Sequence, residues 1–134
     1  MEAIVFEVEI WIDVVEKRDG VLDTVCTLFA PHTLPIRPLC GESLSWHQQR
    51  GASHEFQVWS PIGPSRSSSV CARIDDVGHY AVKSEEGVVV YRTSIRCEAI
   101  EVPSLDDARA LCALMTEQVG FEFDPYAVNR LAEG

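Results

Sequence analysis

The side chains best suited to chemistry in this chain are four histidines and five cysteines, and both kinds are dispersed along the sequence. The sequence holds no glycine-rich phosphate loop, no Gly-x-Ser-x-Gly turn, no His-Glu-x-x-His and no Cys-x-x-Cys. A cysteine beside a histidine would make a nucleophile, but the fold would have to bring the two together. We therefore assign no catalytic residue and no cofactor, and the sequence favours a protein that is not an enzyme.

A metal site can be drawn around one polar turn. His47 and His54 flank this turn, and both would approach one point if the strands on either side paired. Cys40, together with Glu42 or Glu55, would complete the roughly tetrahedral four-ligand set that zinc requires. Nothing in the spacing singles these ligands out, and we predict no metal site.

The cysteines indicate a reducing environment. Their number is odd and no two lie within four residues of each other, which is not the pattern of a disulfide framework. Acidic residues interrupt the apolar run at residues 4–15, so neither a secretory signal nor a membrane span can be drawn there. We expect a cytoplasmic protein with reduced thiols. Free cysteines usually act as small buried apolar side chains, and we expect this of Cys26, Cys40, Cys71, Cys97 and Cys112.

Charge separates the two ends of the chain from its middle, within a formal net charge of −10. Residues 1–25 hold seven acids and two bases, residues 26–97 six and seven, and residues 98–134 eight and two. Nucleic acids and anionic membranes need cationic side chains, so neither is an expected partner. If the two acidic ends meet on one face, that face would favour a basic protein partner.

Five aromatic and charged residues are candidates for binding such a partner. Trp59 and Arg66 border a stretch rich in proline and serine, and Trp11 stands on the polar side of the first strand. Asp106 and Asp107 open the helix expected in the acidic C-terminal part. Large amphipathic side chains and arginine are frequent at interface hot spots. The leading hypothesis is a protein-interaction module of accessory or inhibitor type that binds through these residues.

Two other functions stay open. A curled sheet could enclose a small-molecule pocket in which His79 or Cys71 is the reactive group. The candidate lining residues of that pocket are Trp46, His47, His79 and Tyr80, with Trp59 beside them. Alternatively, the open edges of a sheet could pair in a homodimer that covers Trp11.

The elements that must position these residues are mainly strands. Apolar residues alternate with polar ones at 4–14, which predicts a half-buried strand. Asp19 and Gly20 tolerate a positive φ, so this strand should form a hairpin with a second strand at 21–29. Three prolines between residues 31 and 41 exclude a central strand and predict an extended connection.

Shorter strands are predicted at 43–47, 55–59, 70–75, 79–83 and 88–91, the last continuing to residue 102. Residues 60–69 are expected to be a mobile loop rich in proline and serine, inside a single domain that spans 1–134. Residues 121–134 are expected to be a partly ordered tail.

One helix is predicted, at residues 105–119. Ser104 is suited to cap it, acids occupy its first turn, apolar residues recur every three or four positions, and Gly120 stands where it should end. The expected fold is α+β and mainly β. It is an antiparallel, strongly bent sheet or small open barrel of about seven strands, with the helix packed on it. Antiparallel pairing is favoured because parallel strands need crossover connections that the sequence does not offer.

Overall fold

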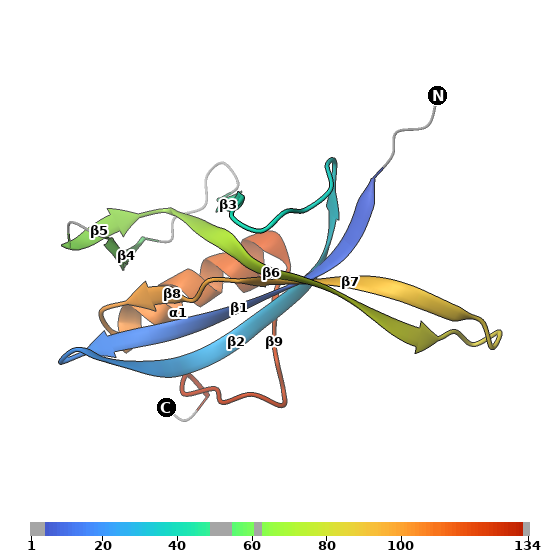
Figure 1. Ribbon diagram of the computed structural model, residues 1–134. Coiled ribbons are helices and arrows are strands. Elements are labelled where there is room, and N and C mark those ends of the chain that lie inside the picture. Colours follow the sequence, from blue (N-terminus) through green and yellow to red (C-terminus); the bar gives the residue numbers. More distant parts are fainter. Residues whose placement is uncertain (1–4, 49–54, 61–62, 133–134) are drawn as a thin grey trace.

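The computed structural model describes residues 5–48, 55–60 and 63–132, with the backbone alone at residues 59, 60, 63 and 64. Figure 1 labels most of its elements. In chain order these elements are β1 (Phe6–Arg18), β2 (Val21–Leu34), β3 (Ser43–His47), β4 (Phe56–Ser60), β5 (Gly63–Ser67), β6 (Ser69–Lys83), β7 (Val89–Cys97), β8 (Ile100–Val102), α1 (Leu105–Ala113), the π-helical turn η1 (Leu114–Val119) and β9 (Glu122–Phe123).

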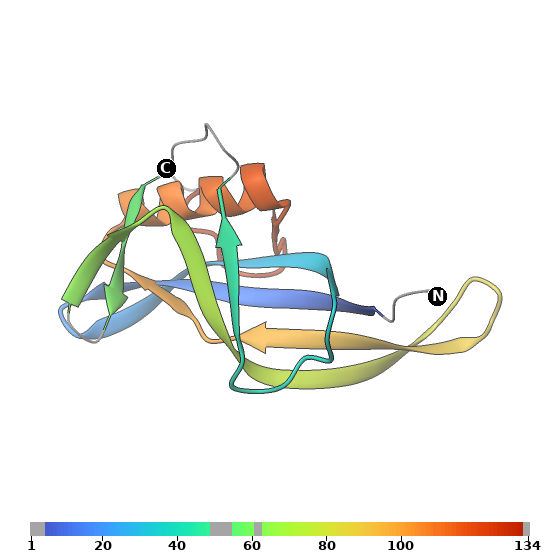
Figure 2. The same ribbon diagram turned by 90° about the horizontal axis from the view of Figure 1, so that it is seen from above.

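The fold is a curled, open sheet with one C-terminal helix on one of its faces, and it confirms the mainly β prediction. The sheet has seven strands in the order β3-β6-β7-β1-β2-β9, and β8 continues the line of β7 along β1. Strands β4 and β5 form a separate hairpin. Figures 1 and 2 show the helix lying along one face of the long strands. No helix of the described residues is long and apolar enough to cross a membrane.

The sheet is mixed, which corrects the prediction of purely antiparallel pairing. β1 pairs with β2 in antiparallel fashion, but it pairs with β7 and β8 in parallel. The argument from crossovers failed because a helix is not the only way to bring a parallel strand back. Here the connection from β1 to its parallel neighbour β7 consists of the strands β2, β3, β4, β5 and β6 and their turns.

The first hairpin forms as the sequence predicts. Asp19 and Gly20 both have positive φ, 51° and 78°, which matches the right-handed twist of the flanking strands. The pairing shifts by one residue between Val14 and Val15. Beyond this bulge Glu16 is buried, and it forms ion pairs with Arg18 at 2.9 Å and Arg130 at 3.1 Å.

The helix occupies the predicted residues, although its last turn is wider than an α-helix. Ser104 Oγ accepts a hydrogen bond from the backbone N–H of Asp107 at 3.1 Å, and Gly120 ends the helix with a φ of 95°. One side of the helix is fully buried against the sheet. Its buried residues are Ala108, Leu111, Cys112, Leu114 and Met115.

Three segments expected to be irregular contain strands. The predicted connection at 31–41 begins with the end of β2, which stays paired with β1 from Pro31 to Leu34. The predicted loop at 60–69 holds all of β5 and the first residue of β6, while residues 61 and 62 lie outside the described residues. The predicted tail contains β9, which pairs with β2. Further along it, the backbone N–H of Arg130 donates to the Val25 carbonyl at 2.8 Å. Described residues 121–132 therefore line the edge of β2.

Strands β6 and β7 continue past the rest of the sheet as a two-stranded arm, here residues 79–92. The last pair between β1 and β7 is Val8 with Thr93, whereas β6 and β7 stay paired as far as Lys83 with Val89. Figures 1 and 2 show this arm leaving the body of the molecule.

Candidate binding surface on the outer face of the sheet

The two faces of the sheet differ because strand β1 alternates. Its inner residues Val8, Ile10, Ile12 and Val14 are buried on the face that the helix covers. The residues between them point to the other face, called here the outer face. Among the described elements none packs over the middle of this outer face (Figures 1 and 2). Side chains there are free to meet another molecule.

A row of side chains crosses the outer face from one strand to the next. The strand register aligns Glu122 with Phe29, Phe29 with Trp11, Trp11 with Arg96, and Arg96 with Asp76. The rings of Trp11 and Phe29 are stacked, with centroids 4.8 Å apart and an interplanar angle of 20°. Both rings are partly buried, and together they form an apolar patch in the middle of a polar face.

Carboxylates border this aromatic pair. On one side Asp13 accepts a hydrogen bond from Thr27 Oγ1 at 2.6 Å and forms an ion pair with Arg96 at 3.4 Å. Glu9 lies on the other side of Trp11 along β1, and Glu122 lies beside Phe29 at the end of the row. Neither carboxylate forms an ion pair or side-chain hydrogen bond within the described part of the chain. We call Glu9, Trp11, Phe29 and Glu122 the outer-face site.

The neighbours of Glu9 leave room around its carboxylate. Glu9 is aligned with Pro31 on one side and with Ser94 on the other, and Ser94 is aligned with Gly78. None of these three has a long side chain. Glu9 also lines a hollow of about 310 Å³ at the base of the arm, together with Tyr91 and Arg92.

This arrangement is suited to holding a cation. Aromatic faces attract guanidinium and ammonium groups, and a carboxylate alongside adds a charge-assisted hydrogen bond. Arginine fits best, because its flat guanidinium can stack on a ring while its N–H groups reach a carboxylate. The outer-face site itself contains no thiol, hydroxyl or imidazole that could act as a nucleophile.

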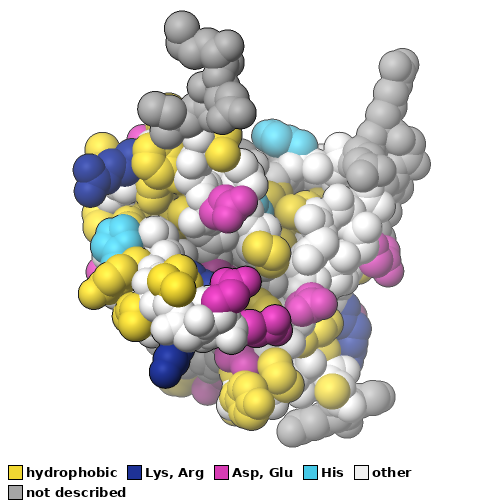
Figure 3. Space-filling view, turned by 90° about the vertical axis from the view of Figure 1, so that its right-hand side faces the viewer, with side chains coloured by type: hydrophobic (Ala, Val, Ile, Leu, Met, Phe, Trp, Pro, Cys, Tyr) yellow, Lys and Arg dark blue, Asp and Glu magenta, His cyan; other side chains and the backbone are white. Residues whose placement is uncertain are grey.

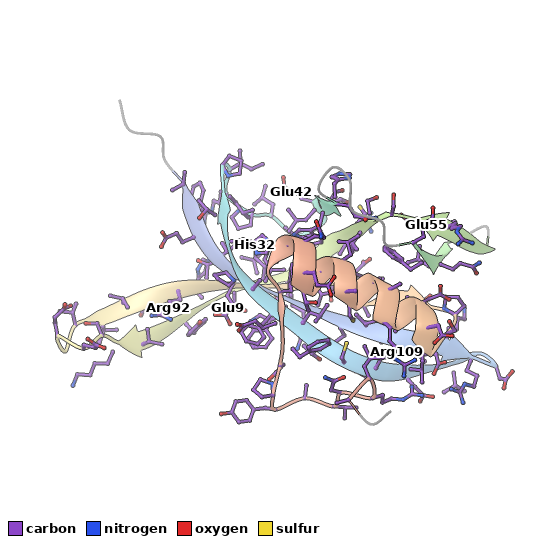
Figure 4. The ribbon with its side chains drawn as sticks, turned by 180° about the vertical axis from the view of Figure 1, so that it is seen from behind. Glu9, His32, Glu42, Glu55, Arg92 and Arg109 are labelled. Atoms are coloured by element: carbon purple, nitrogen blue, oxygen red, sulfur yellow. The ribbon has the colours of Figure 1, made fainter. Side chains whose placement is uncertain are left out.

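Of the five residues selected from the sequence for partner binding, Trp11 alone lies in this site. Arg66 is on β5, where it forms an exposed ion pair with Glu55 at 2.9 Å. Trp59 is on β4, and its side chain lies outside what the structure describes. Figure 4 shows Glu55 at the end of the molecule opposite Arg92 and the arm.

The two helix acids have different surroundings. Asp107 accepts hydrogen bonds from the Gln57 backbone N–H at 2.9 Å and from Ser104 Oγ at 2.7 Å, so it fixes β4 to the start of the helix. The side chain of Asp106 is 94% exposed and forms an ion pair with Arg109 at 3.1 Å. Asp107 therefore serves the fold, and Asp106 is free to meet solvent.

The acidic ends of the sequence meet only in part, where Glu122 joins Glu9 and Asp13 on the outer face. Helix α1 covers the inner face, whereas Glu9 and Asp13 point to the outer face. Arginines from other segments also separate the acids, since Arg96 pairs with Asp13 and Arg130 pairs with Glu16. Charge that is segregated along the chain is interleaved in space.

The residues proposed to line an internal pocket are dispersed. Trp46 is buried in the core, where its Nε1–H donates to His32 Nε2 at 2.9 Å. His47 is exposed on β3, and His79 is exposed on β6 with Thr93 Oγ1 at 3.0 Å. Tyr80 follows His79 on the same strand, so the two point to opposite faces. Side chains of the core and the helix fill the inside of the curl.

The His32 imidazole accepts a hydrogen bond, so the nitrogen that receives it carries no proton. Burial lowers the pKa of His32, and this effect exceeds the opposing influence of the Ala30 and Pro31 backbone. The Phe121 ring packs edge-on against Trp46, with centroids 5.6 Å apart. These three rings close one end of the core and are not a site.

A separate hollow of about 430 Å³ lies between β6 and β8. It is lined by Arg66 and Cys71, two residues selected from the sequence, and also by Arg73, Glu98 and Glu101. Across the described residues, no three His, Cys, Asp or Glu side chains gather where they could hold a metal ion. His54, one ligand of the hypothetical zinc set, lies outside those residues.

Sequence reasoning missed Glu9, Phe29 and Glu122. Phe29 stands at the end of a predicted strand, but the bulge at Val25 of β2 sets its alignment with Trp11. Glu122 lies in the segment predicted as a tail and reaches the site through the pairing of β9 with β2. No protein-family model, curated protein or solved structure matches this chain.

Proposed function

We propose that the protein is a non-enzymatic protein-binding module, of accessory or inhibitor type, that binds a basic partner through the outer-face site. The observation that carries the proposal is the stacked, partly buried pair of Trp11 and Phe29, with Glu9 near Trp11 and Glu122 beside Phe29, two carboxylates that have no cation in the described structure. Interface hot spots combine large aromatic area with charged groups in the same way.

The charge of the surrounding face supports a cationic partner. The strand register places Glu7, Glu9, Asp13, Asp76 and Glu122 on the outer face, against Arg73, Arg92 and Arg96. Arg96 is already paired with Asp13. A basic partner would gain a faster encounter from the net −10 charge of the chain and its affinity from the contact with the aromatic pair.

The proposal can be tested with a defined probe, a blocked seven-residue peptide in which arginine alternates with leucine. Its dissociation constant is measured by calorimetry for the natural chain and for the double variant Glu9→Lys with Glu122→Lys. Removing both carboxylates and adding two positive charges should weaken binding by about a hundredfold, since charge pairs at interfaces contribute about 1.5 kcal/mol or more each.

A matched control separates site binding from general attraction. The double variant Asp23→Lys with Asp106→Lys changes the net charge equally at exposed acids away from the outer face. It should keep most of the affinity. Equal losses in the two variants would show that the peptide responds only to total charge, and the proposed site would be wrong. A peptide with lysine in place of arginine should bind more weakly, because an ammonium group cannot stack in the same way.

A further inference from the structure

The arm carries several large apolar side chains that are exposed to solvent. Val88, Val89 and Tyr91 are 58%, 60% and 76% exposed, and Tyr80 is 38% exposed. A two-stranded ribbon is marginally stable in water without something packed on it. Figure 3 looks at the molecule from the side to which the arm points, and hydrophobic surface is visible there among charged groups.

The arm also has an unpaired strand edge. β1 leaves β7 after Thr93, and within the described ranges no strand pairs with the edge of β7 at residues 89–92. The Ser84 N–H donates to the Val88 carbonyl at 2.8 Å, so Val88, Val90 and Arg92 direct their backbone groups toward β6. Val89 and Tyr91 therefore direct theirs toward the open edge.

Charge does not oppose the approach of two copies of this chain at the arm. The whole chain has a net charge of −10, so most of its surface repels a second copy. Residues 79–92 hold Lys83 and Arg92 against Glu85 and Glu86, and their formal charge is zero. The described structure gives neither Glu86 nor Arg92 an ion-pair partner of its own.

We propose that two copies of the chain associate through the arms, by antiparallel pairing of the free edges of β7 about a two-fold axis at Val90. In this register Val89 of one copy lies opposite Tyr91 of the other, so the backbone groups that face the edge satisfy each other. Val88 lies opposite Arg92. Glu86, at the tip of each arm, then lies diagonal to Arg92 of the other copy.

Strand β6 offers a second free edge, but charge disfavours it. A two-fold axis at Tyr80 would bring Glu85 of one copy opposite Asp75 of the other, and like charges opposite each other destabilise a strand pair. The β7 register avoids this clash. It also covers more of the exposed apolar residues, because Val88, Val89, Val90 and Tyr91 all lie beside the new pair.

This association does not rest on the proposed function, because the outer-face site lies on a face and the pairing uses an edge, although Tyr91 and Arg92 also line the hollow beside Glu9. The edge is short, so the dimer should be weak, with a dissociation constant in the micromolar range, about 10 µM. Sedimentation equilibrium of the full chain over a range of concentrations should show a monomer that becomes a dimer. A monomer at all concentrations up to about 200 µM would overturn the proposal.

Substitutions locate the contact. Val90→Lys places two like charges on the axis and should weaken the dimer by at least about tenfold. Val21→Lys is the matched control, because Val21 is 57% exposed at the far hairpin, and it should have no effect. A circular dichroism melt of each variant confirms that it is folded. A dimer unchanged by Val90→Lys would overturn the proposal.

A charge exchange tests the register. Glu86→Lys and Arg92→Glu should each weaken the dimer, and the double variant should restore it, because the exchanged charges again attract across the axis. Within one chain these residues lie too far apart along the arm to compensate for each other. Two weakened single variants without restoration in the double variant would show that the register is wrong.

Discussion

The body of the molecule and its outer surfaces are built from the same strands, but their apolar residues differ in how far they are buried. Beneath the helix, Ile10, Ile12 and Val14 of β1 have no exposed surface. One residue further along the strand, Trp11 is only partly buried on the other face, and the arm leaves valines and tyrosines exposed. The core residues are explained by the stability of this chain alone, whereas we propose that the outer aromatic pair and the arm serve contact with another molecule.

The largest effect should follow a cavity in the body. Leu111 has no exposed surface at the centre of the contact between helix and sheet. Leu111→Ala should lower the free energy of unfolding by about 2 to 5 kcal/mol, as measured by urea denaturation. A loss well below 1 kcal/mol would contradict the placement of the helix on the sheet.

The next effect should come from the start of the helix. Ser104 Oγ caps the Asp107 N–H at 3.1 Å and donates to Asp107 Oδ2 at 2.7 Å. Ser104→Ala should cost about 1 kcal/mol of unfolding free energy, and Ser104→Asp should recover part of it. An unchanged free energy of unfolding in Ser104→Ala would mean that another group caps the helix.

A smaller, pH-dependent effect should come from His32, because part of its ring meets solvent. The pKa of His32 in the folded protein lies below 6.5. The contribution of its neutral form to the free energy of unfolding is therefore complete above pH 6.5 and is lost as the pH falls through the folded pKa. Protonation would also remove the acceptor for Trp46 Nε1–H. Thermal melts between pH 7.5 and pH 5 should show falling stability in the natural chain and a flatter profile in His32→Gln. Parallel profiles would contradict this role of His32.

The smallest effect on stability should come from the arm. Val89→Ser changes an exposed side chain and should alter the unfolding free energy by no more than about 0.5 kcal/mol. Chemical denaturation at low protein concentration, where the monomer dominates, checks this. A large loss would mean that the arm belongs to the core and that its apolar residues need no partner.

Much of the body could be predicted from the sequence because local signals there agree with the fold. The alternation at residues 4–14, the Asp19-Gly20 turn and the Ser104 cap each act over a few residues, and each forms as predicted. The prediction of irregular structure at 60–69 failed because proline and serine are compatible with the separate hairpin that β4 and β5 form.

The outer-face site could be predicted only in part, because long-range pairing builds it. A two-residue turn with regular pairing would align Trp11 with Leu28, and the bulge after Val14 moves the alignment to Phe29. Glu122 arrives from the other end of the chain through β9. The parallel pairing of β7 with β1 likewise brings Arg96 to Asp13 and divides the acidic regions. No local pattern encodes any of these three contacts.

The most direct test of the division between core and binding surface is the affinity of Trp11→Ala for the arginine–leucine peptide, measured beside its unfolding free energy. The stacked pair on a solvent-facing sheet should add only about 1 kcal/mol to stability, yet it supplies most of the apolar contact for a cation. We predict binding at least about tenfold weaker in a chain that remains folded. Unchanged affinity in the folded variant would contradict the proposal that the outer face is the binding surface.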